Sequence, residues 1–144
     1  MLHISVIIVN WNTQDILINC LDSLYKNTNT PFELHIIDNN SAVQQTRTQV
    51  SPLLQWKHEC DAKIITEPYT ADKGSFINNS GGINTIFGHI ATKYENVHFI
   101  KNNKNMGFAY AVNQGILEST GEYVLTLNPD VIVTEGYVDT LFEK

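Results

Sequence analysis

Blocks of apolar and polar residues follow one another along the chain in the order expected of alternating strands and helices. Residues 4–9 are mostly β-branched and show no alternation, which is typical of a strand covered on both faces in a mostly parallel sheet. A polar loop, NWNT at residues 10–13, leads into residues 14–25, where apolar side chains recur at helical spacing. Thr13 or Asn12 can cap this predicted helix. The chain therefore begins as strand, polar loop and helix.

The same unit then recurs. Residues 33–37 form a second predicted strand, residues 38–41 a polar loop, and the residues up to about 54 a weaker helix. Two strands joined through a helix imply a right-handed crossover. The predicted fold class is therefore α/β, a doubly wound, mostly parallel sheet with helices on both faces.

The middle of the chain is less regular than its two ends. Residues 62–66 are compatible with a third strand, residues 67–84 are rich in Gly, Ser and Asn and predict a long loop, and residues 83–94 predict a helix. The alternation then returns in four further predicted elements: a strand at 97–100, a polar loop at 102–107, a helix at 108–118 ended by Gly121, and a strand at 123–127. We predict one domain over residues 1–144.

Composition and charge narrow the class of protein. The chain has 144 residues, a net charge of −6 and one arginine, Arg47, which argues against a nucleic-acid backbone as its main partner. Cys20 and Cys60 lie far apart and lack metal-ligand spacing, so a reduced, intracellular protein fits best. The first apolar run is short and has no basic region before it, which predicts a buried strand and neither a signal peptide nor a transmembrane segment.

Polar motifs follow the carboxyl ends of four predicted strands: NWNT, DNNS, NNKNMGF and NPD. Ligands of open α/β sheets bind outside these ends, where loops can be polar without disturbing the core. Each motif alone is also an ordinary turn or cap: Asp38 could merely cap a helix, and Asn128–Asp130 could be a type I turn. Their recurrence at one edge of the sheet predicts a binding site instead.

The residue types at this edge suit a nucleoside diphosphate. Trp11 offers a flat face on which a base can stack, and Asp38 can accept hydrogen bonds from a base edge or a ribose hydroxyl. Gly107 allows the backbone to approach a phosphate closely. Asp130 is a hard oxygen ligand of the kind that Mg²⁺ and Mn²⁺ favour. An acidic chain with few basic residues needs such a cation to hold a pyrophosphate.

Four segments of the chain resemble, in order, the family 2 inverting glycosyltransferases with a GT-A, Rossmann-like fold: SVIIVNWNTQDILINCLDSL, HIIDNNS, NMGFAYAVNQGI and GEYVLTLNPDVIV. The chain is most similar to the rhamnosyltransferase-like branch, in which Asn-Pro-Asp often replaces Asp-x-Asp. The resemblance covers the first 41 residues and the chain from about residue 97. It is poor between residues 42 and 96, which implies an insertion there.

The resemblance implies a nucleotide-sugar site and a metal ligand. Asp38 would bind the base, Trp11 would pack near it, and Asp130 would coordinate the metal through this DXD-like motif. Asn128 replaces the first acid of the motif and would bind a ribose or a metal-bound water. The complete set of implied nucleotide-sugar-binding residues is Val9, Asn10, Trp11, Asn12, Asp38, Asn105, Gly107, Phe108 and Asn128.

The implied function is transfer of a sugar, with inversion, from a UDP- or dTDP-linked donor to a hydroxyl of a glycan or lipid-linked acceptor, with Mg²⁺ or Mn²⁺. Such an enzyme of polysaccharide biosynthesis would work in the cytoplasm or peripherally at a membrane. The family's general base lies beyond the Asp-x-Asp position. Glu135, Asp139 and Glu143 have the spacing of a solvated helix face, and none is nominated as the base.

Two alternatives remain open from the sequence. The chain could bind a nucleotide sugar or a partner protein without catalysing transfer, because the acceptor half is missing from view. An unrelated doubly wound domain is less well supported. NWNT stands where a dinucleotide fold needs a glycine-rich turn, and the acid cluster of a receiver-like domain is missing after the first strand.

Overall fold

The computed structural model describes residues 3–41 and 86–143. The expectations for residues 42–85, including the helix to about residue 54, the strand at 62–66 and the loop at 67–84, lie outside these ranges. In the described part, no helix is long and apolar enough to cross a membrane.

Four parallel strands form the sheet of the described residues, in the order β3-β2-β1-β4. The bounds of the strands are β1 Ile4–Asn10, β2 Phe32–Asp38, β3 Val97–Lys101 and β4 Tyr123–Leu127. The four strands predicted within the described ranges are confirmed, each within a residue at either end. Because β1 pairs with β2 on one side and β4 on the other, the loops after these strands meet at one edge of the sheet.

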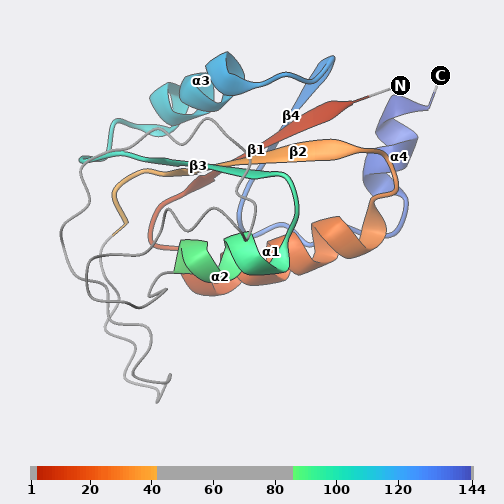
Figure 1. Ribbon diagram of the computed structural model, residues 1–144, viewed down its shortest axis with the longest axis horizontal. Coiled ribbons are helices and arrows are strands. Elements are labelled where there is room, and N and C mark those ends of the chain that lie inside the picture. Colours follow the sequence, from red (N-terminus) through yellow and green to blue (C-terminus); the bar gives the residue numbers. More distant parts are fainter. Residues whose placement is uncertain (1–2, 42–85, 144) are drawn as a thin grey trace.

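Helices cover both faces of this sheet (Figure 1). Their bounds are α1 Gln14–Asn27, α2 Ile86–Lys93, α3 Phe108–Glu118 and α4 Tyr137–Phe142. Figure 1 shows α1 and α2 on one face and α3 on the other, and α4 lies beyond the amino ends of the strands. The doubly wound α/β architecture predicted from the sequence is therefore confirmed.

The side chains of β1 divide between two cores. Ile4, Val6 and Ile8 pack with α1 and α2, whereas Ile7 and Val9 pack beneath α3. Every residue of β1 is buried. An apolar run without alternation is thus explained, since both sides of the strand must exclude water.

Two predicted helix signals have other roles in the structure. The α1 helix begins after Thr13, but the Thr13 hydroxyl donates to Asn10 Oδ1 at 2.7 Å and makes no capping hydrogen bond. The α3 helix ends at Glu118, where the Ser119 N–H donates to the Ile116 carbonyl. Gly121 is therefore not the residue that ends α3, and it lies instead against β1, where a Cβ atom would come within 2.6 Å of Ser5 N.

Asp139 was expected on a solvated helix face, and the structure corrects this. Its carboxylate accepts hydrogen bonds from Thr30 N and Oγ1, both at 2.7 Å, and from Asn29 N at 3.0 Å. The hydrogen bonds from Thr30 and Asn29 lower the pKa of Asp139 below its ordinary value of 3.8. Asp139 thus fixes α4 to the turn between α1 and β2.

Candidate functional site

A hollow of about 320 Å³ lies at the carboxyl ends of the strands. All four strands contribute to its walls, either through their last residues or through the loops that follow them. The lining residues are Val9, Trp11, Thr13, Asn39, Asn105, Gly107, Phe108 and Pro129. We call this hollow the rim pocket. Its position agrees with the rule that ligands of open α/β sheets bind beyond the carboxyl ends of the strands.

Five of the residues predicted for the site line the rim pocket: Val9, Trp11, Asn105, Gly107 and Phe108. Trp11 and Phe108 are 54% and 59% exposed, so their rings are available to a ligand. Asn39, Thr13 and Pro129 also line the pocket, although the sequence analysis did not assign them to binding. Asn39 stood in the quoted DNNS motif, which was the only signal that could have identified it.

Asp38 and Asn10 lie beneath the rim, where they bind each other. Asn10 Nδ2 donates to Asp38 Oδ1 at 2.8 Å and to Ser41 Oγ at 3.1 Å, and the Ser41 N–H donates to Asp38 Oδ2 at 3.2 Å. Both side chains are buried. This arrangement joins the loop after β1 to the loop after β2, and the predicted contact of Asp38 with a base stays a prediction.

Asn39 is the centre of the amide contacts that shape the pocket wall. Its Nδ2 donates to Asn105 Oδ1 at 2.8 Å and to the Gly107 carbonyl at 3.2 Å. Its Oδ1 accepts from the Met106 N–H and from Asn102 Nδ2, both at 3.1 Å. Asn39 is only 2% exposed, so its side-chain hydrogen bonds hold the loop before α3 in one position.

The side-chain amides of Asn102 and Gln114 bind each other, and Asn102 also binds Asn39. Asn102 Nδ2 donates to Gln114 Oε1 at 2.8 Å, and Gln114 Nε2 donates back to Asn102 Oδ1 at 3.0 Å. The Asn102 N–H also donates to the Asp38 carbonyl at 2.9 Å. The wall of the rim pocket is therefore tied to both β2 and α3.

Left-handed backbone conformations recur in the loops of the rim. Asn12, Asn40 and Gly107 have φ values of 58°, 64° and 86°. Asn and Gly adopt this region at the lowest cost among the amino acids. The abundance of asparagine in these loops thus has a conformational cause as well as a chemical one.

The NPD turn follows β4, with Pro129 in the pocket wall and Asn128 and Asp130 exposed. The Val131 N–H closes the turn by donating to the Asn128 carbonyl at 3.2 Å. The proline removes a backbone donor only after the strand has ended. Asp130 is exposed and directly follows Pro129, which lines the pocket.

Cys20 lies under this turn, and the charge of Asp130 affects the pKa of its thiol. Burial, and then the negative charge of Asp130, raise the pKa of the Cys20 thiol from 9.0 to about 11. The protonated thiol donates to the Asn128 carbonyl at 3.6 Å. The turn is thus bound to α1 as well as to β4.

The donors at the rim suit a hard cation. Asp130 offers a carboxylate and Asn128 an amide oxygen, the ligand types that Mg²⁺ and Mn²⁺ prefer. Among the described residues, 3–41 and 86–143, none of the eight that line the rim pocket is basic. An anionic ligand in this pocket would therefore gain from a cation held near Asp130.

A family model described as Glycosyl transferase family 2 matches residues 5–80 and 77–144 of the chain. The chain belongs to glycosyl transferase family 2. A search of curated proteins found no match to this family 2 chain.

Solved structures of S. aureus TarS and of a mannosyltransferase share the fold of this family 2 chain. A structure of S. aureus TarS 1–349 in complex with UDP-GlcNAc is 17% identical, with a TM-score of 0.61, over 97% of this chain and 30% of that chain. The mannosyltransferase PcManGT from Pyrobaculum calidifontis, in complex with GDP-Man and Mn²⁺, is 17% identical, with a TM-score of 0.54, over 88% of this chain and 27% of that chain. The GT-A, Rossmann-like fold is confirmed. This chain spans less than a third of the length of these proteins.

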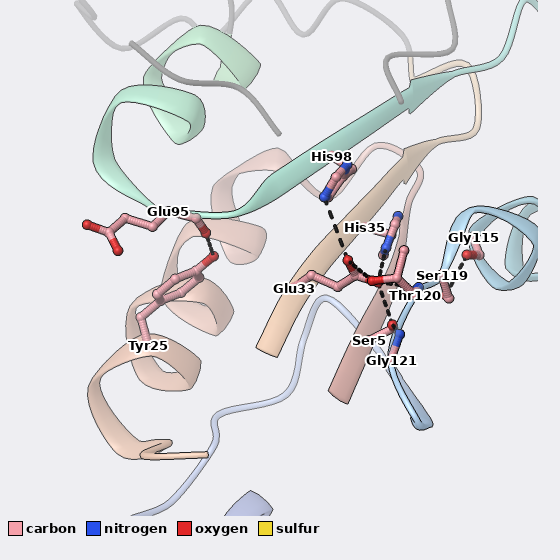
Figure 2. A network of polar contacts seen from close by, with 10 residues as sticks. All are labelled: Ser5, Tyr25, Glu33, His35, Glu95, His98, Gly115, Ser119, Thr120 and Gly121. Atoms are coloured by element: carbon pink, nitrogen blue, oxygen red, sulfur yellow. Dashed lines mark hydrogen bonds and ion pairs between the residues drawn. The ribbon is translucent and has the colours of Figure 1, made fainter. Parts of the chain in front are cut away.

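A second polar cluster of the family 2 chain lies on the α3 face of the sheet, away from the rim (Figure 2). Glu33 Oε1 accepts from Ser5 Oγ at 2.6 Å and from the Thr120 N–H at 2.7 Å, and Glu33 Oε2 accepts from Thr120 Oγ1 at 2.8 Å. Ser5 Oγ in turn accepts from the Gly121 N–H at 2.8 Å. Glu33 thereby joins β2 and β1 to the turn between α3 and β4.

Glu33, His35 and His98 together have the composition of a metal site, with their ligand atoms within 4.8 Å of one another. The two imidazole rings are stacked, however, with centroids 4.6 Å apart and planes inclined by only 15°. A metal must lie in the plane of each imidazole that binds it, and two nearly parallel planes do not meet near the rings. Since Glu33 also holds three donors from Ser5 and Thr120, this cluster has a structural role.

Glu33→Gln is expected to reduce the loss of stability in acid. Burial alone would raise the pKa of Glu33, but the hydrogen bonds from Ser5, Thr120 and His35 together lower it from 4.5 to about 2. The ionised carboxylate therefore stabilises the fold above pH 4.5, and this contribution of about 2 kcal/mol is lost as the pH falls through 4.5 toward 2. Urea denaturation of wild type and variant from pH 6 down to about pH 2 measures the difference.

Glu122→Gln provides the matched control, because its side chain is exposed at the amino end of β4. This control is expected to follow the wild-type pH profile. Equal acid sensitivity of Glu33→Gln and wild type would show that the hydrogen-bonded carboxylate does not stabilise the folded chain.

Proposed function

We propose that this chain is the nucleotide-sugar-binding part of an inverting glycosyltransferase that uses a UDP- or dTDP-linked donor. The supporting observation is the rim pocket, in which the ends of four parallel strands bring Trp11, Asn39 and Asn105 around one hollow. Membership of family 2 supports the same reading. The Asn-Pro-Asp sequence supports the rhamnosyltransferase-like branch.

The residues of the rim have separate roles in this proposal. The exposed ring of Trp11 stacks on the base, since any base offers a flat face. The loop at Asn105–Phe108 lies along the ribose and the diphosphate, and Gly107 leaves room there because a Cβ atom would meet nothing within 4 Å. Asp38 would bind the base, with its carboxylate oriented by the hydrogen bond that Asn10 Nδ2 donates to it.

Asp130 would hold Mg²⁺ or Mn²⁺, with Asn128 as a weaker partner. When bound, the metal acts as a Lewis acid that stabilises the negative charge of the leaving diphosphate. Asp130 suits this role because it is exposed and directly follows Pro129, which lines the pocket. A mannosyltransferase of the same fold is known in complex with Mn²⁺, which supports a metal here.

The acceptor, the cellular location and the general base are the remaining parts of this proposal. We propose a glycan or lipid-linked acceptor, as in polysaccharide biosynthesis, and a cytoplasmic or membrane-peripheral location. The free, buried thiol of Cys20 supports a reducing compartment. Asp139 is a poor candidate for the base, because its carboxylate is occupied by Asn29 and Thr30.

Asp130→Ala is expected to abolish the effect of metal on nucleotide binding. In calorimetric titrations with UDP and with dTDP, we expect one of the two to bind the wild-type chain about tenfold more tightly with Mn²⁺ than without it. The variant should bind equally with and without Mn²⁺, because it lacks the carboxylate. Glu122→Ala, which removes an exposed carboxylate at the opposite end of β4, should behave as wild type.

Two outcomes would contradict parts of this proposal. Absence of UDP and dTDP binding to the wild-type chain would remove the nucleotide-sugar site. A metal effect that survives in Asp130→Ala would remove Asp130 from its role. Sustained sugar transfer to a simple acceptor would exclude the alternative of a binding domain without activity.

A further inference from the structure

One edge of α1 carries three polar side chains that bind the segment after β4. Cys20, Ser23 and Asn27 stand at spacings of three and four residues, which places them on the same side of the helix. We call them the α1 edge. Figure 1 shows the segment after β4 passing beneath the sheet, close to α1, on its way to α4.

The α1 edge holds this segment at both of its ends. Cys20 Sγ donates to the Asn128 carbonyl at 3.6 Å. Five residues later, the Val133 N–H donates to Ser23 Oγ at 2.9 Å, and Asn27 Nδ2 donates to the Val133 carbonyl at 2.7 Å. Ser23 is itself oriented, because its hydroxyl donates to the Cys20 carbonyl at 2.8 Å.

Between these anchors the Val131 N–H donates to the Asn128 carbonyl and closes the NPD turn. In the described structure, residues 131–134 belong to neither a helix nor a strand. Val133 is 1% exposed and Ile132 is 62% exposed, so the segment is pinned at alternate residues. Asp130 lies within the span that the anchors at Asn128 and Val133 enclose.

We propose that Ser23, together with Cys20 and Asn27, is a positioning residue for Asp130. The inference rests on the proposed function, in which Asp130 binds a divalent cation beside a nucleoside diphosphate. A carboxylate on a fixed segment loses less conformational entropy on binding a cation than one on a mobile segment. Partners that orient a metal ligand are commonly worth tenfold or more in metal affinity.

The test compares two serines with matched surroundings. Ser23 and Ser119 are both half-buried, and each donates to a helix carbonyl three or four residues earlier, but only Ser23 receives the Val133 N–H. The nucleotide is UDP or dTDP, whichever binds wild type, and the readout is the ratio of its Kd without Mn²⁺ to its Kd with Mn²⁺. The Kd of the corresponding nucleoside, uridine or thymidine, reports the base pocket alone.

We expect Ser23→Ala to reduce the Kd ratio about fivefold and to leave nucleoside binding unchanged. Ser119→Ala should keep the wild-type ratio, and Ser23→Thr should restore it because the hydroxyl is retained. Cys20→Ala, which removes the other anchor, should also reduce the ratio and serves if Ser23→Ala does not fold. A thermal unfolding curve of each variant separates loss of fold from loss of positioning.

The outcomes distinguish this inference from the proposed function. If wild type shows no metal effect on either nucleotide, the proposed function and this inference both fail. If Asp130→Ala loses the metal effect while Ser23→Ala and Cys20→Ala keep it, only the positioning role is overturned. Loss of nucleoside binding in Ser23→Ala would also overturn it, because the α1 edge would then act on the whole site.

Discussion

Replacing Gly121 with alanine is expected to remove about 3 kcal/mol from the free energy of unfolding. The added Cβ would lie 2.6 Å from Ser5 N, 2.7 Å from Ser5 Oγ and 2.9 Å from the His3 carbonyl oxygen. Two of these atoms are backbone, and the third is the hydroxyl that links Gly121 to Glu33, so none can move aside cheaply (Figure 2). Urea denaturation followed by circular dichroism measures the loss.

Gly136→Ala is the control for this substitution. Gly136 has a φ of +68°, but a Cβ there would meet nothing within 4 Å. We expect a loss of about 1 kcal/mol from the left-handed conformation alone. Equal losses for the two variants would show that close approach to β1 is not why Gly121 is a glycine.

The sheet and most of its helices could be predicted from the sequence because burial leaves a direct pattern. Residues 4–9 are apolar on both faces apart from Ser5, and residues 33–37 place Leu34 and Ile36 in the core beneath α1 and Ile37 in the core beneath α3, since helices cover both faces of the sheet. The α3 helix has its predicted bounds, Phe108–Glu118. Where the signal was weak or the chain lies outside the described ranges, as at residues 42–85, the predictions stay untested.

Two helix-end signals in the sequence have other roles in the structure. The Thr13 hydroxyl binds Asn10 rather than the helix that follows it. Gly121 follows a helix, as an end signal would, but is required by its contact with β1. A hydrogen bond within the preceding loop decides the role of Thr13, and a tertiary contact decides that of Gly121.

The location of the rim pocket at the carboxyl ends of the strands was predictable from the sequence, whereas the full set of residues that line it was not. Parallel topology alone brings the loops after β1, β2 and β4 to one edge. Which of two adjacent residues faces the pocket depends on the loop backbone, and here Asn39 lines it while Asp38 turns to Asn10. The partner of Asn39 is 66 residues away at Asn105, a contact that no sequence spacing reveals.

Asn39→Asp is expected to disrupt the pocket wall more than any other isosteric change at the rim. The substitution replaces the Nδ2 donor with an oxygen that faces Asn105 Oδ1 and the Gly107 carbonyl, at sites that are now 2.8 Å and 3.2 Å away. Because residue 39 is 2% exposed, a carboxylate there is poorly solvated. We expect a loss of about 3 kcal/mol in stability and about tenfold weaker nucleotide binding.

Asn40→Asp makes the same chemical change one residue further along the chain and isolates the role of the buried amide. Asn40 is exposed, and its φ of 64° is one that aspartate also tolerates. Denaturation curves and UDP or dTDP titrations of this control should match wild type. If Asn39→Asp behaves like Asn40→Asp in both measurements, the loop before α3 keeps its shape without the Asn39 donor, and the pocket wall must depend on the Asn102–Gln114 pair instead.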